Sequence, residues 1–183
     1  DTEISKLRVG DIARLGMLRT FQQTRIYSKM DCVDNMQISV SHREGSSNSM
    51  FASRRGEIRD RAEHLLEFVG LYSKRSLISG DLSFGQQKLL EFAMALMNEP
   101  KVLLLDEPTA GINPTLINGL IDRLRRANEE LGITLCVIEH NMRVIMNLAS
   151  HIYCLSNGKM LANGKPEELQ NDPRVIDAYL GGH

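Results

Sequence analysis

The chain has 183 residues, with 22 basic and 23 acidic side chains and a formal net charge of −1 at pH 7. This length allows one sizeable core, or a core with a small subdomain. A net charge near zero gives no electrostatic argument for nucleic acid or an anionic membrane as a partner. The three cysteines, Cys32, Cys136 and Cys154, form no C-x-x-C pair and are typical of small buried residues in a reducing cytosol.

The first third of the chain is predicted to be mostly helical. Residues 9–19 read as a short capped helix that Gly16 ends, and a loop with Gln22 follows. Residues 27–81 contain no run that could join a buried sheet. An amphipathic stripe in this stretch ends at Gly70 and consists of Ile58, Ala62, Leu65, Leu66 and Val69. We therefore interpret residues 27–81 as a helical subdomain.

Basic side chains in this stretch do not indicate a nucleic-acid surface. The arginines at 54, 55, 59 and 61 alternate with the acidic residues Glu57, Asp60 and Glu63. Interleaved charges of opposite sign are typical of a solvated helix face.

The centre of the chain combines a helix with a strand. Apolar residues recur at helical spacing over residues 86–98, which predicts a helix with one apolar stripe, and Pro100 ends it. Residues 102–105 form an unbroken apolar run, as expected of a strand buried on both faces of a parallel sheet. Asp106 and Glu107 follow directly, so two carboxylates stand at the end of the predicted strand.

These carboxylates indicate a site, because ligands of open α/β sheets bind beyond the carboxyl ends of the strands. An Asp at such an end holds a Mg²⁺-bound phosphate in ATP-hydrolysing folds, and the neighbouring Glu107 can act as base for the attacking water. Ser83 and Gly85 precede a helix N-terminus, which favours a phosphate. Each feature alone has a plainer reading: a strand that meets a polar loop, or an N-cap serine.

The remaining elements continue in β-α-β order. Periodic apolar residues after Pro114 predict a helix that Gly132 closes, and residues 133–138 predict the next buried strand. A helix is expected at 142–149. Residues 152–161 predict a hairpin around Asn157-Gly158, and short helices are expected after Pro166 and at 175–180.

Four segments occur in one order along the chain: LSFGQQ at 82–87, LLLDEP at 103–108, AGINP at 110–114 and IEH at 138–140. This ordered set resembles the ATP-binding-cassette (ABC) family of ATPases. The resemblance implies an α/β fold of the P-loop NTPase (RecA-like) type, a parallel sheet core with an inserted helical subdomain. Residues 1–26 and 82–165 would form the ATPase core, and residues 166–183 a C-terminal helical tail.

The resemblance assigns roles to the motif residues. Ser83, Phe84, Gly85 and Gln86 match the signature loop, which contacts the nucleotide held by the other subunit of a dimer. Asp106 matches the Mg²⁺-coordinating Asp, and Glu107 the catalytic Glu. Asn113 stands where many cassettes carry the Asp of a loop that crosses the dimer interface, a departure that importers of branched-chain amino acids often share.

Two further roles follow from the same resemblance. His140 matches the switch histidine that senses the γ-phosphate; standing alone, it would read as a histidine at the end of the strand at 133–138. Residues 11–22 are similar to the stretch that leads into the catalytic, metal-contacting glutamine of the branched-chain amino acid cassettes. Gln22 is the match, and that glutamine couples the nucleotide to the membrane subunit. The close DPRVIDAYLG at 172–181 also resembles those cassettes.

A phosphate-binding loop of the form G-x-x-x-x-G-K-[ST] does not occur in the sequence. Because the resemblance begins well inside the family's domain, we expect a fragment without its N-terminal strands and that loop, which also fits the first residue, Asp1 rather than Met. The strand expected beside residues 102–105 would then be absent, which would expose an apolar sheet edge. We expect such a chain to be poorly soluble by itself and to hydrolyse no ATP in cis.

The sequence therefore predicts the ATPase subunit of an ABC importer, for branched-chain or related amino acids. Its cofactors would be ATP and Mg²⁺. Its partners would be a second ATPase subunit, transmembrane permease subunits and, indirectly, a periplasmic binding protein, with no nucleic acid, at the cytoplasmic face of the inner membrane. Two alternatives stay open: an ABC ATPase with another cargo, such as lipid or lipopolysaccharide export, and a non-catalytic module that only pairs with a permease or an intact ATPase.

Overall fold

The computed structural model describes residues 2–20, 25–40 and 50–179. Contacts divide the chain into two compact units, Asp1–Ile138 and Glu139–His183. The break falls inside the stretch 82–165 that the sequence assigns to one core. Gln22 lies outside the described residues.

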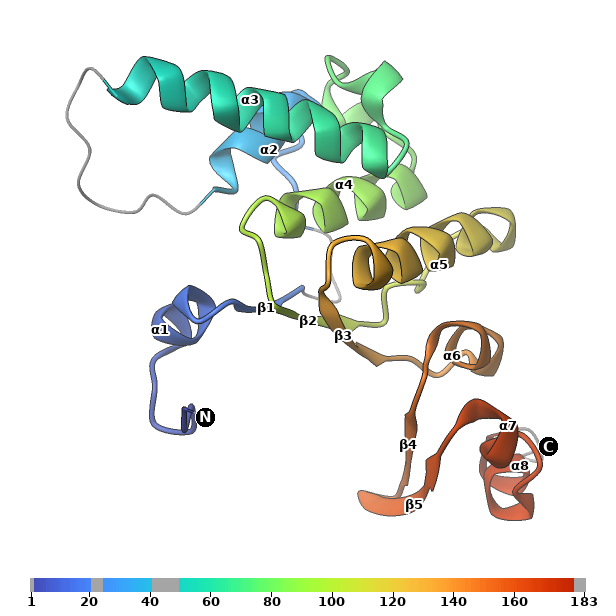
Figure 1. Ribbon diagram of the computed structural model, residues 1–183. Coiled ribbons are helices and arrows are strands. Elements are labelled where there is room, and N and C mark those ends of the chain that lie inside the picture. Colours follow the sequence, from blue (N-terminus) through green and yellow to red (C-terminus); the bar gives the residue numbers. More distant parts are fainter. Residues whose placement is uncertain (1, 21–24, 41–49, 180–183) are drawn as a thin grey trace. The chain divides into compact units, whose positions relative to one another are not determined.

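The first unit contains a parallel sheet with the strand order β1-β2-β3. Its helices and strands follow one another as α1 (Val9–Arg14), β1 (Met17–Arg19), α2 (Cys32–Ile38), α3 (Met50–Phe68), α4 (Phe84–Leu96), β2 (Val102–Asp106), α5 (Pro114–Glu129) and β3 (Thr134–Ile138). Two single-turn 3₁₀ helices, Tyr72–Lys74 and Ser79–Asp81, lie between α3 and α4. Helices α4 and α5 lie on the same side of the sheet (Figure 1). This is the α/β architecture expected from the sequence.

The predicted helix over residues 9–19 is wrong beyond Gly16. Helix α1 ends at Arg14, Gly16 takes a φ of 94°, and β1 pairs with β2 in the register Met17↔Val102. The Gly16 carbonyl accepts hydrogen bonds from the backbone N–H groups of Lys101 (2.8 Å) and Val102 (3.1 Å). A left-handed φ suits glycine, so the chain leaves the helix and enters the sheet within two residues.

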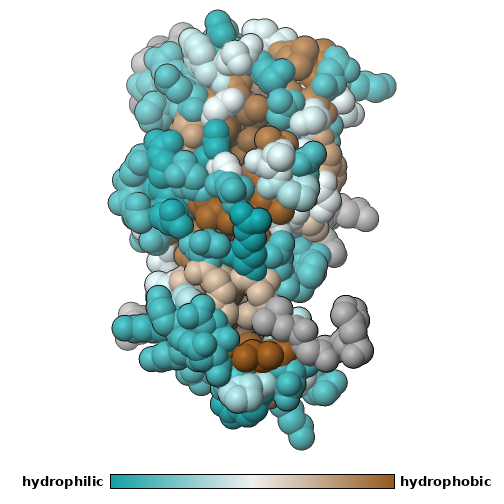
Figure 2. All heavy atoms as spheres, turned by 90° about the vertical axis from the view of Figure 1, so that its right-hand side faces the viewer, coloured by the Kyte–Doolittle hydropathy of each residue, from teal (hydrophilic) through white to brown (hydrophobic). Residues whose placement is uncertain are grey.

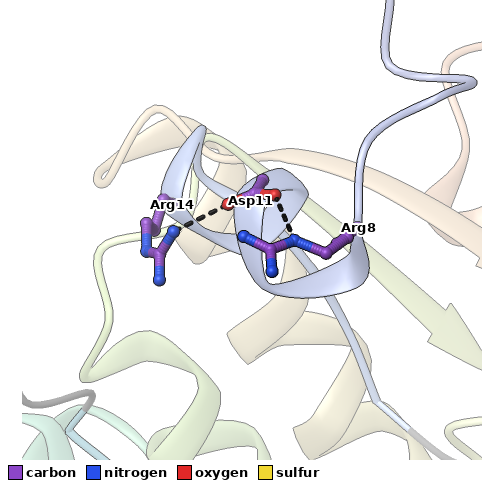
Figure 3. Close-up of polar contacts among 3 residues, drawn as sticks. All are labelled: Arg8, Asp11 and Arg14. Atoms are coloured by element: carbon purple, nitrogen blue, oxygen red, sulfur yellow. Dashed lines mark hydrogen bonds and ion pairs between the residues drawn. The ribbon is translucent and has the colours of Figure 1, made fainter.

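Helix α1 buries none of its residues. Its local order comes from ion pairs: the Asp11 carboxylate accepts from Arg8 at 3.1 Å and from Arg14 at 2.7 Å, one on each side (Figure 3). Both arginine side chains are mostly exposed, so each pair adds little to the free energy of unfolding.

The expectation that both sheet faces are buried is also wrong for the described residues. In β2, Leu103 and Leu105 are 0% and 3% exposed, whereas Val102 and Leu104 are only partly buried. The buried face packs on α4 and α5, since Leu105 lines a small cavity with Phe92 and Leu120.

Strand β2 is the central strand of the sheet, so the prediction of an unpaired edge beside residues 102–105 is wrong. Its two neighbours, β1 and β3, pair with it along both sides.

Strand β3 is not the buried strand that its composition predicts, because Ile138 is 60% exposed and Cys136 is exposed as well. The prediction of a buried Cys136 fails for the same reason, whereas Cys32 and Cys154 are buried.

The helical stretch before α4 agrees with the sequence pattern. Ala62, Leu65, Leu66 and Val69 are buried, and Gly70 ends the helix with a φ of 78°. Arg59 pairs with Glu63 at 3.1 Å on the exposed side of α3, as expected of a solvated face.

Helix α4 is buried on more than the one stripe predicted from its sequence. Leu90, Phe92, Ala93, Met94 and Leu96 are all buried. The helix packs against α2 and α3 as well as over the sheet, so several of its faces meet protein. It connects α2 and α3 with the sheet.

The second unit has its own core. It consists of α6 (Met142–Leu148), the antiparallel hairpin of β4 (Ile152–Ser156) and β5 (Lys159–Gly164), α7 (Pro166–Leu169) and α8 (Pro173–Tyr179). The buried residues of this core are Ile145, Ile152, Cys154, Ala162, Leu169 and Val175. The predicted hairpin is confirmed: Asn157 and Gly158 take φ values of 50° and 73°, as a type I′ turn requires.

Hydrophobic side chains also reach the surface. Figure 2 shows them in brown among hydrophilic residues in teal. The exposed ones in the second unit include Tyr153, Leu155 and Met160. Within the described part of the chain, no helix is both long and apolar enough to cross a membrane.

Candidate functional site

The candidate site lies at the carboxyl end of the central strand. Asp106 is the last residue of β2 and pairs in register with Ile138 of β3. Its carboxylate accepts a hydrogen bond from the Arg19 guanidinium at 2.8 Å, and its side chain is 25% exposed. The carboxyl end of β1 therefore supplies a counter-charge to the carboxyl end of β2, which sequence analysis missed because it read β1 as helix.

Glu107 turns the chain sharply beyond the strand. Its φ is 46°, a left-handed value that is uncommon for a residue other than glycine and tends to occur at functional positions. Its N–H donates to the Ile138 carbonyl at 2.9 Å, and its carbonyl accepts from Ala110 N–H at 3.1 Å. Bonds on both sides hold this conformation, so the position of Glu107 is well defined by the backbone.

Ser83 and Gln86 form a capping box at the N-terminus of α4. The Ser83 hydroxyl accepts from Gln86 N–H at 3.4 Å, and the Gln86 side chain accepts from Ser83 N–H at 3.1 Å. The N-cap reading of Ser83 is therefore confirmed. A helix start that is closed in this way is a rigid platform for the loop that precedes it.

The segments 83–86 and 110–114 pack against each other. Gly111 has a φ of 73°, and a Cβ there would lie 2.9 Å from the Phe84 ring. A Cβ on Gly85 would lie 3.0 Å from a methyl carbon of Leu116 and 3.6 Å from Ile112. Both glycines thus permit an approach that any side chain would obstruct, and the structure brings together two motifs that are about 25 residues apart in the chain.

Asn113 has a structural task of its own. Its side-chain oxygen accepts from Thr115 N–H at 3.0 Å and from the Thr115 hydroxyl at 2.9 Å, which caps α5. An Asp carboxylate at this position could accept the same bonds. The departure from Asp therefore preserves the cap.

Beneath the site, α4 carries a buried ion pair that sequence analysis did not single out. Lys88 Nζ lies 3.7 Å from Glu91 Oε2, and the two side chains are only 5% and 11% exposed. Burial raises the pKa of Glu91, and Lys88 opposes that effect. The sequence signal was a Lys and a Glu three residues apart in a helix whose following residues are apolar.

Two of the predicted site residues are not placed with the others. His140 is exposed and lies at the start of the second unit, next to Asn141, whose side chain caps α6. Gln22 is outside the described residues. The first unit thus brings together Asp106, Glu107 and the two loops, and leaves the roles of His140 and Gln22 as predictions.

The residues present fit a Mg²⁺ ion that takes one carboxylate ligand from the protein and its other ligands from phosphates and water. Among the described residues, no three His, Cys, Asp or Glu side chains are grouped as a metal cage. Mg²⁺ in phosphate-transfer sites is commonly held by one or two carboxylates, substrate phosphates and water, so a cage is not needed. The partly exposed Asp106 carboxylate, at the end of the strand, suits that mode.

Comparison with known families agrees with this geometry. The family model described as "ABC transporter" matches residues 4–110, and the model described as "Branched-chain amino acid ATP-binding cassette transporter" matches residues 159–183. The chain therefore belongs to the ABC transporter family, and the ATP-binding cassette is the class of ATPase that its fold and site define.

Relatives of the chain in sequence include ATP-binding proteins of branched-chain amino acid transport. Over 187 residues the chain is 36% identical to the high-affinity branched-chain amino acid transport ATP-binding protein BraF of Pseudomonas aeruginosa, with 98% of this chain and 73% of BraF covered. It is 34% identical to LivG of Escherichia coli, a protein of the same description, with 99% and 74% covered.

Solved structures show the same fold. The ADP conformation of MJ1267, an ATP-binding cassette of an ABC transporter, matches with a TM-score of 0.80 and 28% identity. The alignment includes 100% of this chain and 75% of the MJ1267 chain. CbiO1 from Clostridium perfringens, part of the ABC transporter complex cbiONQ, matches with a TM-score of 0.79 and 26% identity, covering 97% and 70%. The expected fold class is confirmed.

Proposed function

We propose that this chain belongs to the ATP-hydrolysing subunit of an ABC importer for branched-chain or closely related amino acids. The observation that carries the reaction is the Asp106-Glu107 pair at the carboxyl end of the central parallel strand, where the backbone holds Glu107 from both sides. The cargo is supported by the names of the relatives and by the match over residues 159–183.

In this proposal Glu107 accepts a proton from the water that attacks the γ-phosphate. Asp106 would hold Mg²⁺, which, when bound, offsets the negative charge of the phosphates. Arg19 holds the Asp106 carboxylate at the strand end through the 2.8 Å contact, so the residue is oriented before any ligand arrives.

The two packed loops act on a second nucleotide. Ser83, Phe84, Gly85 and Gln86 would complete the ATP site of a partner ATPase subunit, with Asn113 on the loop that crosses the interface. Their mutual contact through Gly111 and Phe84 supports a shared task, because one loop cannot shift without the other. His140 would sense the γ-phosphate and Gln22 would link the nucleotide, through its metal, to the membrane subunit.

The subunit would work as a dimer on two transmembrane permease subunits at the cytoplasmic face of the membrane, supplied indirectly by a periplasmic binding protein. Residues 27–81 would form the helical subdomain that, with the Gln22 loop, receives the permease. The buried face of α4 against α2 and α3 supports this role, since it joins that subdomain to the sheet.

The test of the reaction is Glu107→Gln in the subunit assembled with its permease. ATP binding should persist while steady-state phosphate release falls by a factor on the order of 10² to 10⁴, the range for a positioned base. Glu129→Gln, an exposed acidic residue near the end of α5, is the matched control and should leave turnover unchanged. Normal turnover in Glu107→Gln would remove this residue from the mechanism.

The cargo is tested separately with the wild-type assembly in vesicles. Leucine, isoleucine or valine, presented with the binding protein, should stimulate ATP hydrolysis and be taken up. Stimulation by lipid or lipopolysaccharide instead would assign the same ATPase to export.

A further inference from the structure

The buried Lys88–Glu91 pair has no part in the reaction proposed above, yet it lies beside Asp106, at the carboxyl end of the central strand. Both residues line a cavity of about 20 Å³ together with Thr20, Asp106 and Pro108. Thr20 continues the pairing of β1, with its N–H donating to the Leu104 carbonyl at 2.9 Å. The pair thus meets the ends of β1 and β2 from the side of α4.

Glu91 also reaches a third segment. Its Oε1 accepts a hydrogen bond from the backbone N–H of Arg25 at 3.4 Å, while Oε2 faces Lys88 Nζ at 3.7 Å. One carboxylate therefore joins α4 to the chain that leads from β1 toward α2. Each oxygen has a different partner, which fixes the orientation of the side chain.

A buried pair of this kind is sensitive to small displacements. Removing two charges from water is costly, and only close geometry between them offsets that cost. Sliding α4 along the sheet would separate Glu91 from Arg25 while leaving both charges buried. An apolar contact at this place would lose much less free energy if α4 slid along the sheet, because hydrophobic contacts have no directional requirement.

We propose that Glu91 is a positioning residue that, with Lys88, holds α4 in register with the strand ends and so sets the position of the signature segment Ser83–Gln86 relative to Asp106 and Glu107. The inference rests on the proposed function. Lys88 lies two residues after Gln86, so a shift of the pair moves the capped helix start and the loops packed on it together.

The decisive variant replaces the pair by apolar residues of similar size, Lys88→Met with Glu91→Leu. Such replacements of buried ion pairs are often neutral or stabilising, so the melting temperature should stay within a few degrees. In the assembled transporter, kcat for ATP should nevertheless fall on the order of 10-fold to 10²-fold, with KM within a few-fold, since misplacement of a positioned group by about 1 Å has that effect. The control is Arg8→Met with Asp11→Leu, which removes a pair of the same i,i+3 spacing at the start of α1, a helix with no buried residue, and should change neither value.

Lys88→Met with Glu91→Gln is the conservative variant, because it leaves no buried charge without a partner. The amide oxygen at position 91 can still accept from Arg25 N–H, so kcat should recover to within about threefold of the wild type if positioning is the cause. A wild-type kcat in the folded double variant overturns the inference. So does a loss of kcat in the conservative variant as large as in the double variant together with an equal fall in melting temperature, since that identifies a purely structural pair.

A measurement without turnover keeps the test independent of the proposed function. Amide hydrogen exchange at residues 83–86 should accelerate at least several-fold in the double variant, and the exchange of α5 should not change. If Glu107→Gln leaves turnover intact, the proposed reaction fails, and the exchange rates still decide whether Glu91 positions the helix. Unchanged exchange at 83–86 refutes the positioning role.

Discussion

The three cysteines show how much the surroundings of a residue alter its chemistry. Cys32 is 0% exposed and its sulfur donates toward the Leu77 carbonyl at 3.6 Å. Burial, and to a lesser extent the charge of Asp31, raises the pKa of the Cys32 thiol to about 11. Burial also raises the pKa of Cys154, whereas Cys136 is exposed on β3.

This difference predicts an order of reactivity with iodoacetamide at pH 8. Cys136 should be modified first and Cys32 last, because the reacting species is the thiolate and a pKa of about 11 leaves very little of it at that pH. Raising the pH toward 11 should increase the labelling of Cys32, since more of the thiol is ionised. Mass spectrometry of the folded protein reads the sites, with Cys136→Ser as the control; equal rates at Cys32 and Cys136 would contradict the structure.

At the scale of an element, two helix starts carry residues of the candidate site. Helix α4 begins with the Ser83–Gln86 capping box, and α5 begins with Asn113 bonded to Thr115. In both cases a residue that the family resemblance assigns to nucleotide contact also satisfies the helix N-terminus. These candidate residues are therefore held at capped helix ends rather than on free loops.

The cap on α5 predicts different results for two substitutions at one position. Asn113→Ala should lower the free energy of unfolding by about 1 kcal/mol, the usual cost of losing an N-cap side chain. Asn113→Asp should retain the stability, because its carboxylate can accept from Thr115 N–H and suits a helix N-terminus. Urea denaturation followed by circular dichroism measures both; an unstable Asn113→Asp would show that the amide donors of Asn113 matter.

At the scale of the whole molecule, two cores stabilise two units. The core of residues 139–183 is closed by Leu169 and Val175, which are 3% and 1% exposed, and Tyr179 donates to the Leu155 carbonyl at 2.6 Å. The core of the first unit includes Leu90, Leu103 and Leu124, each 0% exposed. Separate cores allow separate local unfolding.

Leu169→Ala should therefore destabilise the second unit by about 2–5 kcal/mol, the usual cost of a cavity at a buried leucine. Hydrogen exchange should rise across α6, β4 and β5, while the amides of α4 stay protected. Leu155→Ala is the control, because that side chain is 57% exposed and its loss should change stability by about 0.5 kcal/mol or less. A loss of protection in α4 equal to that in β4 would show that the two units unfold as one.

The sequence by itself determined the features that depend on neighbours along the chain. Helical periodicity predicted α4 and α5, the Asn157-Gly158 turn predicted the hairpin, and the order of four short motifs predicted the family. The Asp106-Glu107 pair could be placed at a strand end because an apolar run followed by carboxylates is a local pattern. The cap at Ser83 is local in the same sense.

Only the tertiary structure decided the features that depend on residues far apart in sequence. Strand β1 is three residues long, too short to show an alternation of polar and apolar residues. It is a strand only because the Gly16 carbonyl accepts from Lys101 N–H and the residues after it pair with β2. The contact from Arg19 to Asp106 and the bond from Arg25 to Glu91 follow from that placement. Burial was decided in the same way, because exposure of Ile138 and enclosure of Lys88 depend on which elements pack above them, and no local composition specifies that.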